Sequence, residues 1–195
     1  MATAVTTDEI YKRYLDKAIG EILRLEREIA EASGGAPVAQ PTGHPLGTIF
    51  LLKYGPQASE LQEGVAFHGR AGHALKRSLD RLKVDALEVF GTNCVKFAAA
   101  DEEACRAWLK RELRIVQPRL LVVMGEDALR FTNEVEFPLS RPLQATLGEF
   151  QRFTPTIEAL VVPDIDLSLD EQPAKTRFWN AFKPVGSWWA ELPPY

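Results

Sequence analysis

Residues 48–75, TIFLLKYGPQASELQEGVAFHGRAGHAL, contain the local signals that decide the fold. The run IFLL near the start is apolar and partly β-branched, which is typical of a buried strand. Gly55-Pro56 ends this strand, because proline has no backbone N–H for the ladder. Gly69 and Gly72 then flank the start of a helix. A strand, a turn, a glycine-containing loop and a helix N-terminus together favour a site for a small polar ligand.

The overall composition is that of an ordinary soluble domain. With 195 residues, of which 46% are hydrophobic and 26% charged, the chain suits one domain with a single core. No apolar run reaches the roughly 18 residues of a membrane span, and the N-terminus lacks the apolar segment of a signal peptide. We therefore expect a cytoplasmic protein without membrane contact. The net charge of −4 gives no electrostatic indication of nucleic-acid binding.

The N-terminal part of the chain predicts one long helix, at 8–32. Its apolar residues form a heptad-like stripe. They are Tyr11, Leu15, Ala18, Ile22, Leu25 and Ile29. Two interpretations fit this stripe: a helix packed along the body of the domain, or a helix that contacts a protein partner or a second copy of the chain. We divide the chain into this helix (1–35), a linker loop (36–47) and one globular domain (48–195).

Strand-like and helix-like segments alternate through the rest of the chain. Buried strands are expected at 49–52, 87–91, 119–125 and 160–162, and helices at 70–83, 101–117, 126–132 and 174–183. This alternation favours an open, mostly parallel sheet with helices on both faces. Ligands of such sheets bind beyond the carboxyl ends of the strands. Four segments should therefore meet at one edge, namely 53–57, 92–96, 125–127 and 163–169.

Three motifs in this order carry a family resemblance. GVAFHGRAGHAL (64–75) is similar to G-R-P-F-V-G-R-A-G-x-x-L, and TNCVK (92–96) to T-N-x-V-K. ACRAWLKRELRIVQPRLLVVMG (104–125) is similar to A-C-x-x-W-L-x-x-Q-L-x-x-I-x-P-x-x-I-V-x-L-G. The chain thus resembles the uracil-DNA glycosylase superfamily over residues 48–183, most closely its iron–sulfur branch, family four. The resemblance implies a three-layer α/β/α sandwich around a four-stranded parallel sheet, a role in base-excision DNA repair, and a pocket for a flipped base.

The resemblance also assigns binding residues. Phe67 matches the aromatic residue that stacks on the flipped base, and Asn93 matches the asparagine that reads the base edge. An amide suits this role because it both donates and accepts, which complements the uracil imide. Gln57, at the end of the first motif, joins them as an expected base-binding residue. Arg70 and Lys76 are candidates for phosphate contacts, with a solvated helix face as the alternative.

The catalytic positions of the family are substituted. Its first motif, G-E-A-P-G, stands here as KYGPQ, so that Tyr54, neutral near pH 7, replaces the water-positioning carboxylate. Its second motif, H-P-S or H-P-A, is replaced by PDID, which places Asp164 at the histidine position. An ionised aspartate there would oppose the negative charge that grows on the base during excision. His68 replaces an apolar family residue and is a candidate for a relocated acid or oxyanion donor.

The family's iron–sulfur cluster has few matching ligands in this chain. Cys105 matches one cluster ligand, whereas Phe97 stands at the position of another. The chain has two cysteines, and such a cluster needs four thiolates. We therefore expect no iron–sulfur cluster, no metal and no other cofactor. Cys94 and Cys105 are interpreted as small buried apolar residues.

Two functions follow as hypotheses. The substituted catalytic residues favour a divergent protein with lost or much reduced excision, which keeps a nucleobase pocket and acts in binding or interaction. The alternative is an active glycosylase that hydrolyses the N-glycosidic bond of uracil or another deaminated or modified base, with His68, Asp166 or Tyr54 in new roles. Contact with DNA, single-stranded or through a flipped base, is expected to be weak. Residues 164–171 include four carboxylates and no basic residue, which disfavours phosphate contacts.

Overall fold

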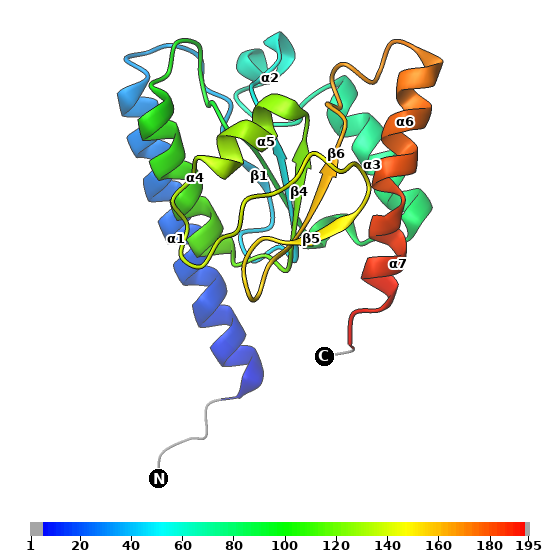
Figure 1. Cartoon of the computed structure of the whole chain (residues 1–195). Coiled ribbons are helices and arrows are strands. Elements are labelled where there is room, and N and C mark those ends of the chain that lie inside the picture. The colour runs from blue at the N-terminus through cyan, green and yellow to red at the C-terminus, as the bar shows by residue number, and fades with distance from the viewer. Residues whose placement is uncertain (1–5, 194–195) are drawn as a thin grey trace.

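A six-stranded sheet forms the centre of the protein (Figure 1). The computed structural model describes residues 6–193, and the strands lie in the order β1-β3-β2-β4-β6-β5. The four central strands are parallel, as predicted. They are β3 (Val89–Asn93), β2 (Ile49–Lys53), β4 (Leu120–Met124) and β6 (Glu158–Val162). Two short antiparallel edge strands complete the sheet, β1 (Thr42–Gly43) beside β3 and β5 (Phe150–Arg152) beside β6.

Helices cover both faces of the sheet, and this explains the strand sequences. Every residue of β2, β3 and β4 is buried. These strands therefore show no alternation of apolar and polar residues. One face packs against α1 (Thr7–Ala32), α4 (Glu102–Val116) and α5 (Glu126–Asn133). The other packs against α3 (Arg70–Leu82), α6 (Gln172–Phe182) and α7 (Pro184–Ala190). The described chain, 6–193, contains no helix with the length and apolar character needed to cross a membrane.

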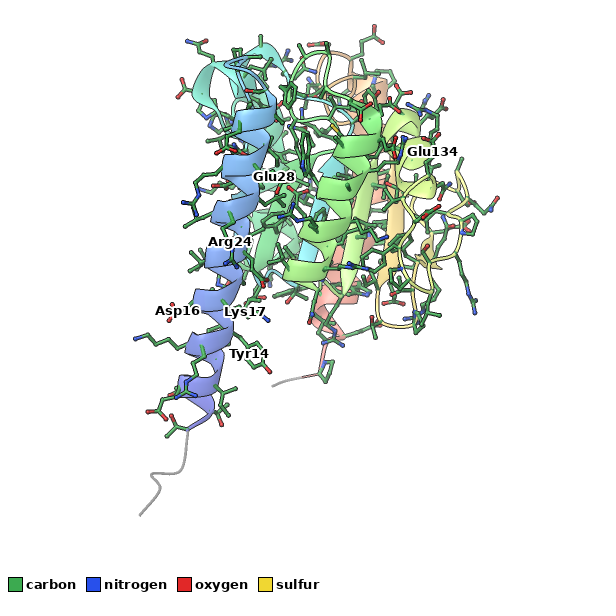
Figure 2. The ribbon with its side chains drawn as sticks, turned by 90° about the vertical axis from the view of Figure 1, so that its left-hand side faces the viewer. Tyr14, Asp16, Lys17, Arg24, Glu28 and Glu134 are labelled. Carbon is green, nitrogen blue, oxygen red and sulfur yellow. The ribbon has the colours of Figure 1, made fainter. Side chains whose placement is uncertain are left out.

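The long N-terminal helix lies along the domain for about half of its length. Its N-cap is Thr6, whose hydroxyl accepts from the Glu9 backbone while the Glu9 carboxylate accepts from the Thr6 backbone. Its buried residues lie in the C-terminal part and face α4. They are Ala18, Ile22, Leu25 and Ile29. The N-terminal turns project beyond the domain, with Tyr11 and Tyr14 exposed (Figure 2). Binding of a partner to these turns stays a prediction.

The four segments expected to converge do meet at the carboxyl edge of the sheet. The last residue of β2, Lys53, forms an ion pair with Asp166 in the loop after β6. The Cys94 backbone, after β3, donates to the Lys53 carbonyl. Gly125, after β4, lies so close to Asp164 that a Cβ at position 125 would be 3.0 Å from the Asp164 Cβ. Helix α2 (Ala58–Glu63) and the 3₁₀ turn η1 (Ala86–Glu88) complete the element list.

Candidate functional site

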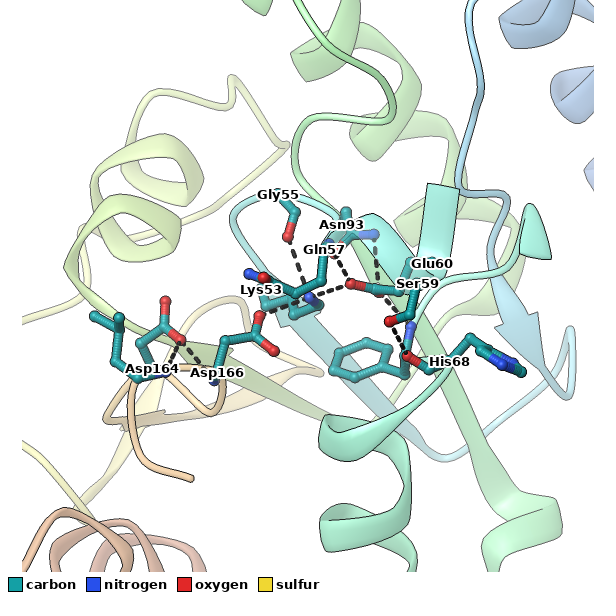
Figure 3. A network of polar contacts seen from close by, with 11 residues as sticks. Lys53, Gly55, Gln57, Ser59, Glu60, His68, Asn93, Asp164 and Asp166 are labelled. Carbon is teal, nitrogen blue, oxygen red and sulfur yellow. Dashed lines mark hydrogen bonds and ion pairs between the residues drawn. The ribbon is translucent and has the colours of Figure 1, made fainter. Parts of the chain in front are cut away.

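A buried carboxylate, Glu60 of α2, is the centre of a polar network at this edge (Figure 3). The residue is 1% exposed. Its Oε1 accepts from the Phe67 backbone at 2.5 Å and from the Asn93 amide at 3.4 Å. Its Oε2 accepts from Lys53 Nζ at 2.5 Å and from the Gln57 backbone at 2.6 Å. One side chain therefore fixes the end of β2, the end of β3 and the loop that carries Phe67.

Lys53 extends this network to the loop at 163–171. Its ammonium donates to Glu60, to the Gly55 carbonyl at 3.1 Å and to Asp166 Oδ2 at 2.7 Å. The Lys53 side chain is 1% exposed, and two carboxylates compensate its positive charge. A lysine buried to this extent without such partners would be strongly destabilising. The same Nζ lies 5.7 Å from the centre of the Phe67 ring, within cation–π range. The lysine thus lies over the ring on which a base is expected to stack.

The backbone at Phe67 adopts a conformation that few residues take. Its φ is +59°, in the left-handed region. The bond from its N–H to Glu60 helps to hold this conformation. Its carbonyl lies against the first turn of α3, where a Cβ on Gly72 would be 1.9 Å from the oxygen. Its ring lies against β3, where a Cβ on Gly91 would be 2.8 Å from the ring. The close packing therefore requires glycine at both positions.

A second buried ion pair supports the segment that carries Asn93. Lys96 Nζ donates to both carboxylate oxygens of Glu112 at 2.8 Å and also to the Thr92 hydroxyl. Lys96 and Glu112 are both 0% exposed, and burial raises the pKa of Glu112. Asn93 is also fully buried, and its Oδ1 has no hydrogen-bond partner among the described residues. This oxygen is an acceptor that the protein itself leaves unused.

Tyr54 lies away from Phe67. Its hydroxyl donates to Glu102 at 2.7 Å, and its ring packs edge-on against Phe131 under α4 and α5. Phe67 belongs to the apolar cluster on the opposite face of the sheet. The hydrogen bond to Glu102, together with partial burial, raises the pKa of Tyr54, so the phenol stays protonated. The structure therefore does not bring the Tyr54 hydroxyl to the ring of Phe67.

The Asp164 side chain forms hydrogen bonds within the loop in which it lies. Its Oδ1 accepts from the backbones of Asp166 and Leu167, and burial raises its pKa. The His68 side chain is exposed and extends away from Lys53 (Figure 3). Gln57 is exposed as well, and its contact with the network is the backbone bond to Glu60.

A cavity of about 400 Å³ lies between α3 and the sheet, beside Phe67. His68 and Lys76 line it together with apolar side chains such as Leu75. Lys53 and Asn93 are absent from its described lining. This cavity shares Phe67 with the Glu60 network but is not lined by the network's lysine or by Asn93.

Most carboxylates of the acidic loop bind donors of the protein. Asp166 pairs with Lys53, and Asp170 pairs with Arg70 at 2.7 Å. The Asp164 carboxylate accepts two backbone N–H groups. Three of the four carboxylates in 164–171 are thus bound by donors of the protein, although Lys53 shares its single charge between Asp166 and Glu60.

Sequence reasoning missed four buried charged residues, which are Lys53, Glu60, Lys96 and Glu112. For some of them a signal existed. A lysine directly after the apolar run IFLL is unusual, because the strand that it ends is otherwise wholly apolar. Glu60 stands three residues after the helix N-cap, where a carboxylate accepts backbone N–H groups. Glu112 interrupts the buried stripe of α4.

The cysteines do not fit an iron–sulfur cluster. Cys105 is buried, and the Phe97 ring, at another ligand position, packs 6.1 Å from that of Trp108. Burial raises the pKa of both Cys94 and Cys105, which favours the neutral thiol over the ligating thiolate. Among the described residues, no group of three or more His, Cys, Asp or Glu side chains could hold a metal ion.

The fold and the site define a doubly wound α/β protein in which Glu60 joins the backbone of Phe67 and the buried amide of Asn93 at the carboxyl edge of the sheet. A sequence model of the uracil DNA glycosylase superfamily matches residues 41–184, and the chain belongs to this superfamily. The predicted family is thereby confirmed.

Two curated relatives support closeness to family four. The chain is 33% identical over 85 residues to a type-4 uracil-DNA glycosylase of Pyrobaculum aerophilum, an alignment that covers 40% of this chain and 43% of the relative. It is 28% identical over 98 residues to a type-4 uracil-DNA glycosylase of Sulfurisphaera tokodaii, covering 46% of this chain and 44% of the relative. Each alignment therefore spans less than half of the relative's length.

Proposed function

We propose that this protein is a superfamily member that does not excise uracil and acts in binding, with its own Lys53 side chain filling the base site. The observation that carries the proposal is the position of the Lys53 ammonium, 5.7 Å from the centre of the Phe67 ring and bonded to Glu60 and Asp166. A base and this ammonium cannot both occupy the space over the ring.

The groups around the site also lack the chemistry of excision. Cleavage of the glycosidic bond requires donors aimed at the negative charge that develops on the leaving base. Asp164 stands where the family has its donor, and Tyr54 points its hydroxyl to Glu102 instead of toward Phe67. Base binding by Phe67, Asn93 and Gln57 stays a prediction, and it requires Lys53 to leave the site. The unpartnered Oδ1 of Asn93 could then accept an N–H of the base.

Two measurements test the proposal. In the first, the protein is incubated with single- and double-stranded oligonucleotides that contain uracil, and abasic sites are cleaved with alkali; we expect no cleavage product. In the second, uracil binding is compared between the wild type and Lys53→Gly, which installs the family's glycine and leaves room for water beside Glu60. We expect stronger binding by Lys53→Gly. The matched control is Lys83→Gly, since Lys83 is an exposed helix C-cap with φ +58°.

An active glycosylase is the second candidate. Asp166 favours it, because this carboxylate is 16% exposed beside the site and could orient a water molecule. Oligonucleotides with hypoxanthine, xanthine or a thymine mismatch extend the assay to other bases. Robust abasic-site formation by the wild type that Asn93→Ala or Asp166→Asn abolishes would overturn our proposal in favour of this one.

A further inference from the structure

The cavity between α3 and the sheet has an apolar interior. Its volume of about 400 Å³ lies within the range of small-molecule sites. Aliphatic side chains from the helix and from two strands form its walls, among them Leu51, Leu75, Leu79 and Val89. All four of these residues are buried. An occupant of this space would therefore gain mainly from apolar contact.

The exposed residues of the lining give the mouth of the cavity the opposite character. Lys76 is exposed on α3 and forms no ion pair within the part of the chain that the structure describes. The His68 and His73 side chains are exposed as well, and an imidazole can donate an N–H even when it is neutral. The described lining contains no carboxylate. The mouth thus offers donors to an anionic group, whereas the walls are apolar.

We propose that this cavity binds a medium-chain aliphatic carboxylate. Its hydrocarbon chain lies between α3 and the sheet, and its carboxylate accepts from Lys76 and from the two imidazoles at the mouth. Lys76 is the one lysine or arginine of the described lining. A single positive charge matches a carboxylate, which carries one negative charge, better than a phosphate monoester, which carries nearly two. The binding requires neither Lys53 nor Asn93 and goes beyond the proposed function.

Two glycines of the lining have a separate structural reason. A Cβ on Gly72 or on Gly91 would meet the carbonyl or the ring of Phe67. The close packing of Phe67 therefore explains the missing side chains on that wall. It does not explain a mouth with three donors and no carboxylate in a chain whose acidic residues outnumber its basic ones.

The test is a ¹³C NMR titration of the full chain with hexanoate, octanoate and decanoate, each labelled at the carboxyl carbon and kept below its micelle concentration. Each pair of added methylenes should strengthen binding by about tenfold, because every buried CH₂ contributes a similar gain. The increase should end once the cavity is full, so that tetradecanoate binds no more tightly than decanoate. A flat apolar surface would show no such limit.

Two variants with matched controls locate the ligand. Lys76→Met should weaken decanoate about threefold, as expected for an exposed ion pair, and leave decanol unchanged. Its control is Lys12→Met, an exposed lysine of α1 on the other face of the sheet, which should change neither ligand. Ala86→Phe fills the mouth from an exposed position and should weaken decanoate at least about tenfold. Its control, Leu87→Phe, changes the neighbouring residue, which is 75% exposed and not part of the described lining.

Absence of binding by all the carboxylates would show that the cavity is only a void beside Phe67 and would overturn the proposal. Equal losses in Ala86→Phe and Leu87→Phe, or no loss in either, would place the ligand elsewhere and overturn it too. If Lys76→Met weakens decanoate and decanol equally, or weakens neither, the assignment of the carboxylate to the mouth is wrong. None of these probes contains a base, so failure here leaves the proposed function to its own assays.

Discussion

Replacing Lys53 with methionine should destabilise the fold by about 3 kcal/mol, because it leaves Glu60 buried without its cation. Removing one partner of a buried ion pair usually costs about 3–5 kcal/mol. We expect a cost at the lower end of this range, since Glu60 keeps the N–H donors of Phe67, Gln57 and Asn93. Methionine fills most of the volume of lysine, so water cannot enter to hydrate the carboxylate.

A double-mutant cycle shows whether the cost comes from this pair. Glu60→Gln alone should cost at least about 2 kcal/mol, because each carboxylate oxygen accepts from two donors and the amide NH2 group takes the place of one oxygen. In the double variant neither charge remains, so the combined cost should be smaller than the sum by at least about 1 kcal/mol.

Urea unfolding followed by circular dichroism measures all four proteins. Lys17→Met is the control, because Lys17 is mostly exposed and 4.0 Å from Glu21, and its loss should cost less than about 0.5 kcal/mol. The reasoning is refuted if Lys53→Met lies within about 1 kcal/mol of the wild type, or if the two single costs simply add.

Three further predictions concern single positions. Gly72→Ala should lower stability in thermal unfolding by at least about 2 kcal/mol, because the new Cβ meets the Phe67 carbonyl and the backbone must shift. Burial raises the pKa of Asp164 above its ordinary value of 3.8. Its contribution to the free energy of unfolding is therefore complete below pH 3.8 and is lost as the pH rises through the folded-state pKa. Asp164→Asn keeps the acceptor oxygen and should lack this decline in urea unfolding at a series of pH values; identical profiles would contradict the assignment. Cys94 and Cys105, whose thiol pKa values burial raises, should resist Ellman's reagent in the native protein and react in urea.

The parallel core of the fold was predictable from the sequence because it is buried on both sides. Strands such as β4 then consist of unbroken apolar runs, which stand out from the charged helices around them. The edge strands β1 and β5 gave no comparable signal, since they have two and three residues and are partly exposed. A part of the expected linker loop therefore belongs to the sheet.

The site was predictable to the extent that its residues stand in motifs. Phe67 and Asn93 were placed at one edge by their motifs, and the structure joins both to Glu60. The lysine between two carboxylates was not predictable, because Lys53 and Asp166 are 113 residues apart. No periodicity or spacing rule connects positions so distant, and the charge of Lys53 becomes buried only when the loop after β6 folds over β2.

The shared bonds of Glu60 have a consequence for local opening. Four segments depend on one carboxylate and its lysine: the ends of β2 and β3, the loop before α3 and the loop after β6. Groups that share a buried partner lose it together, so this edge should open as one cooperative unit and not loop by loop. The amide proton of Phe67, bonded to Glu60, then exchanges with solvent only when the whole edge is open. Its exchange rate measures how often the space over the Phe67 ring becomes accessible to a ligand.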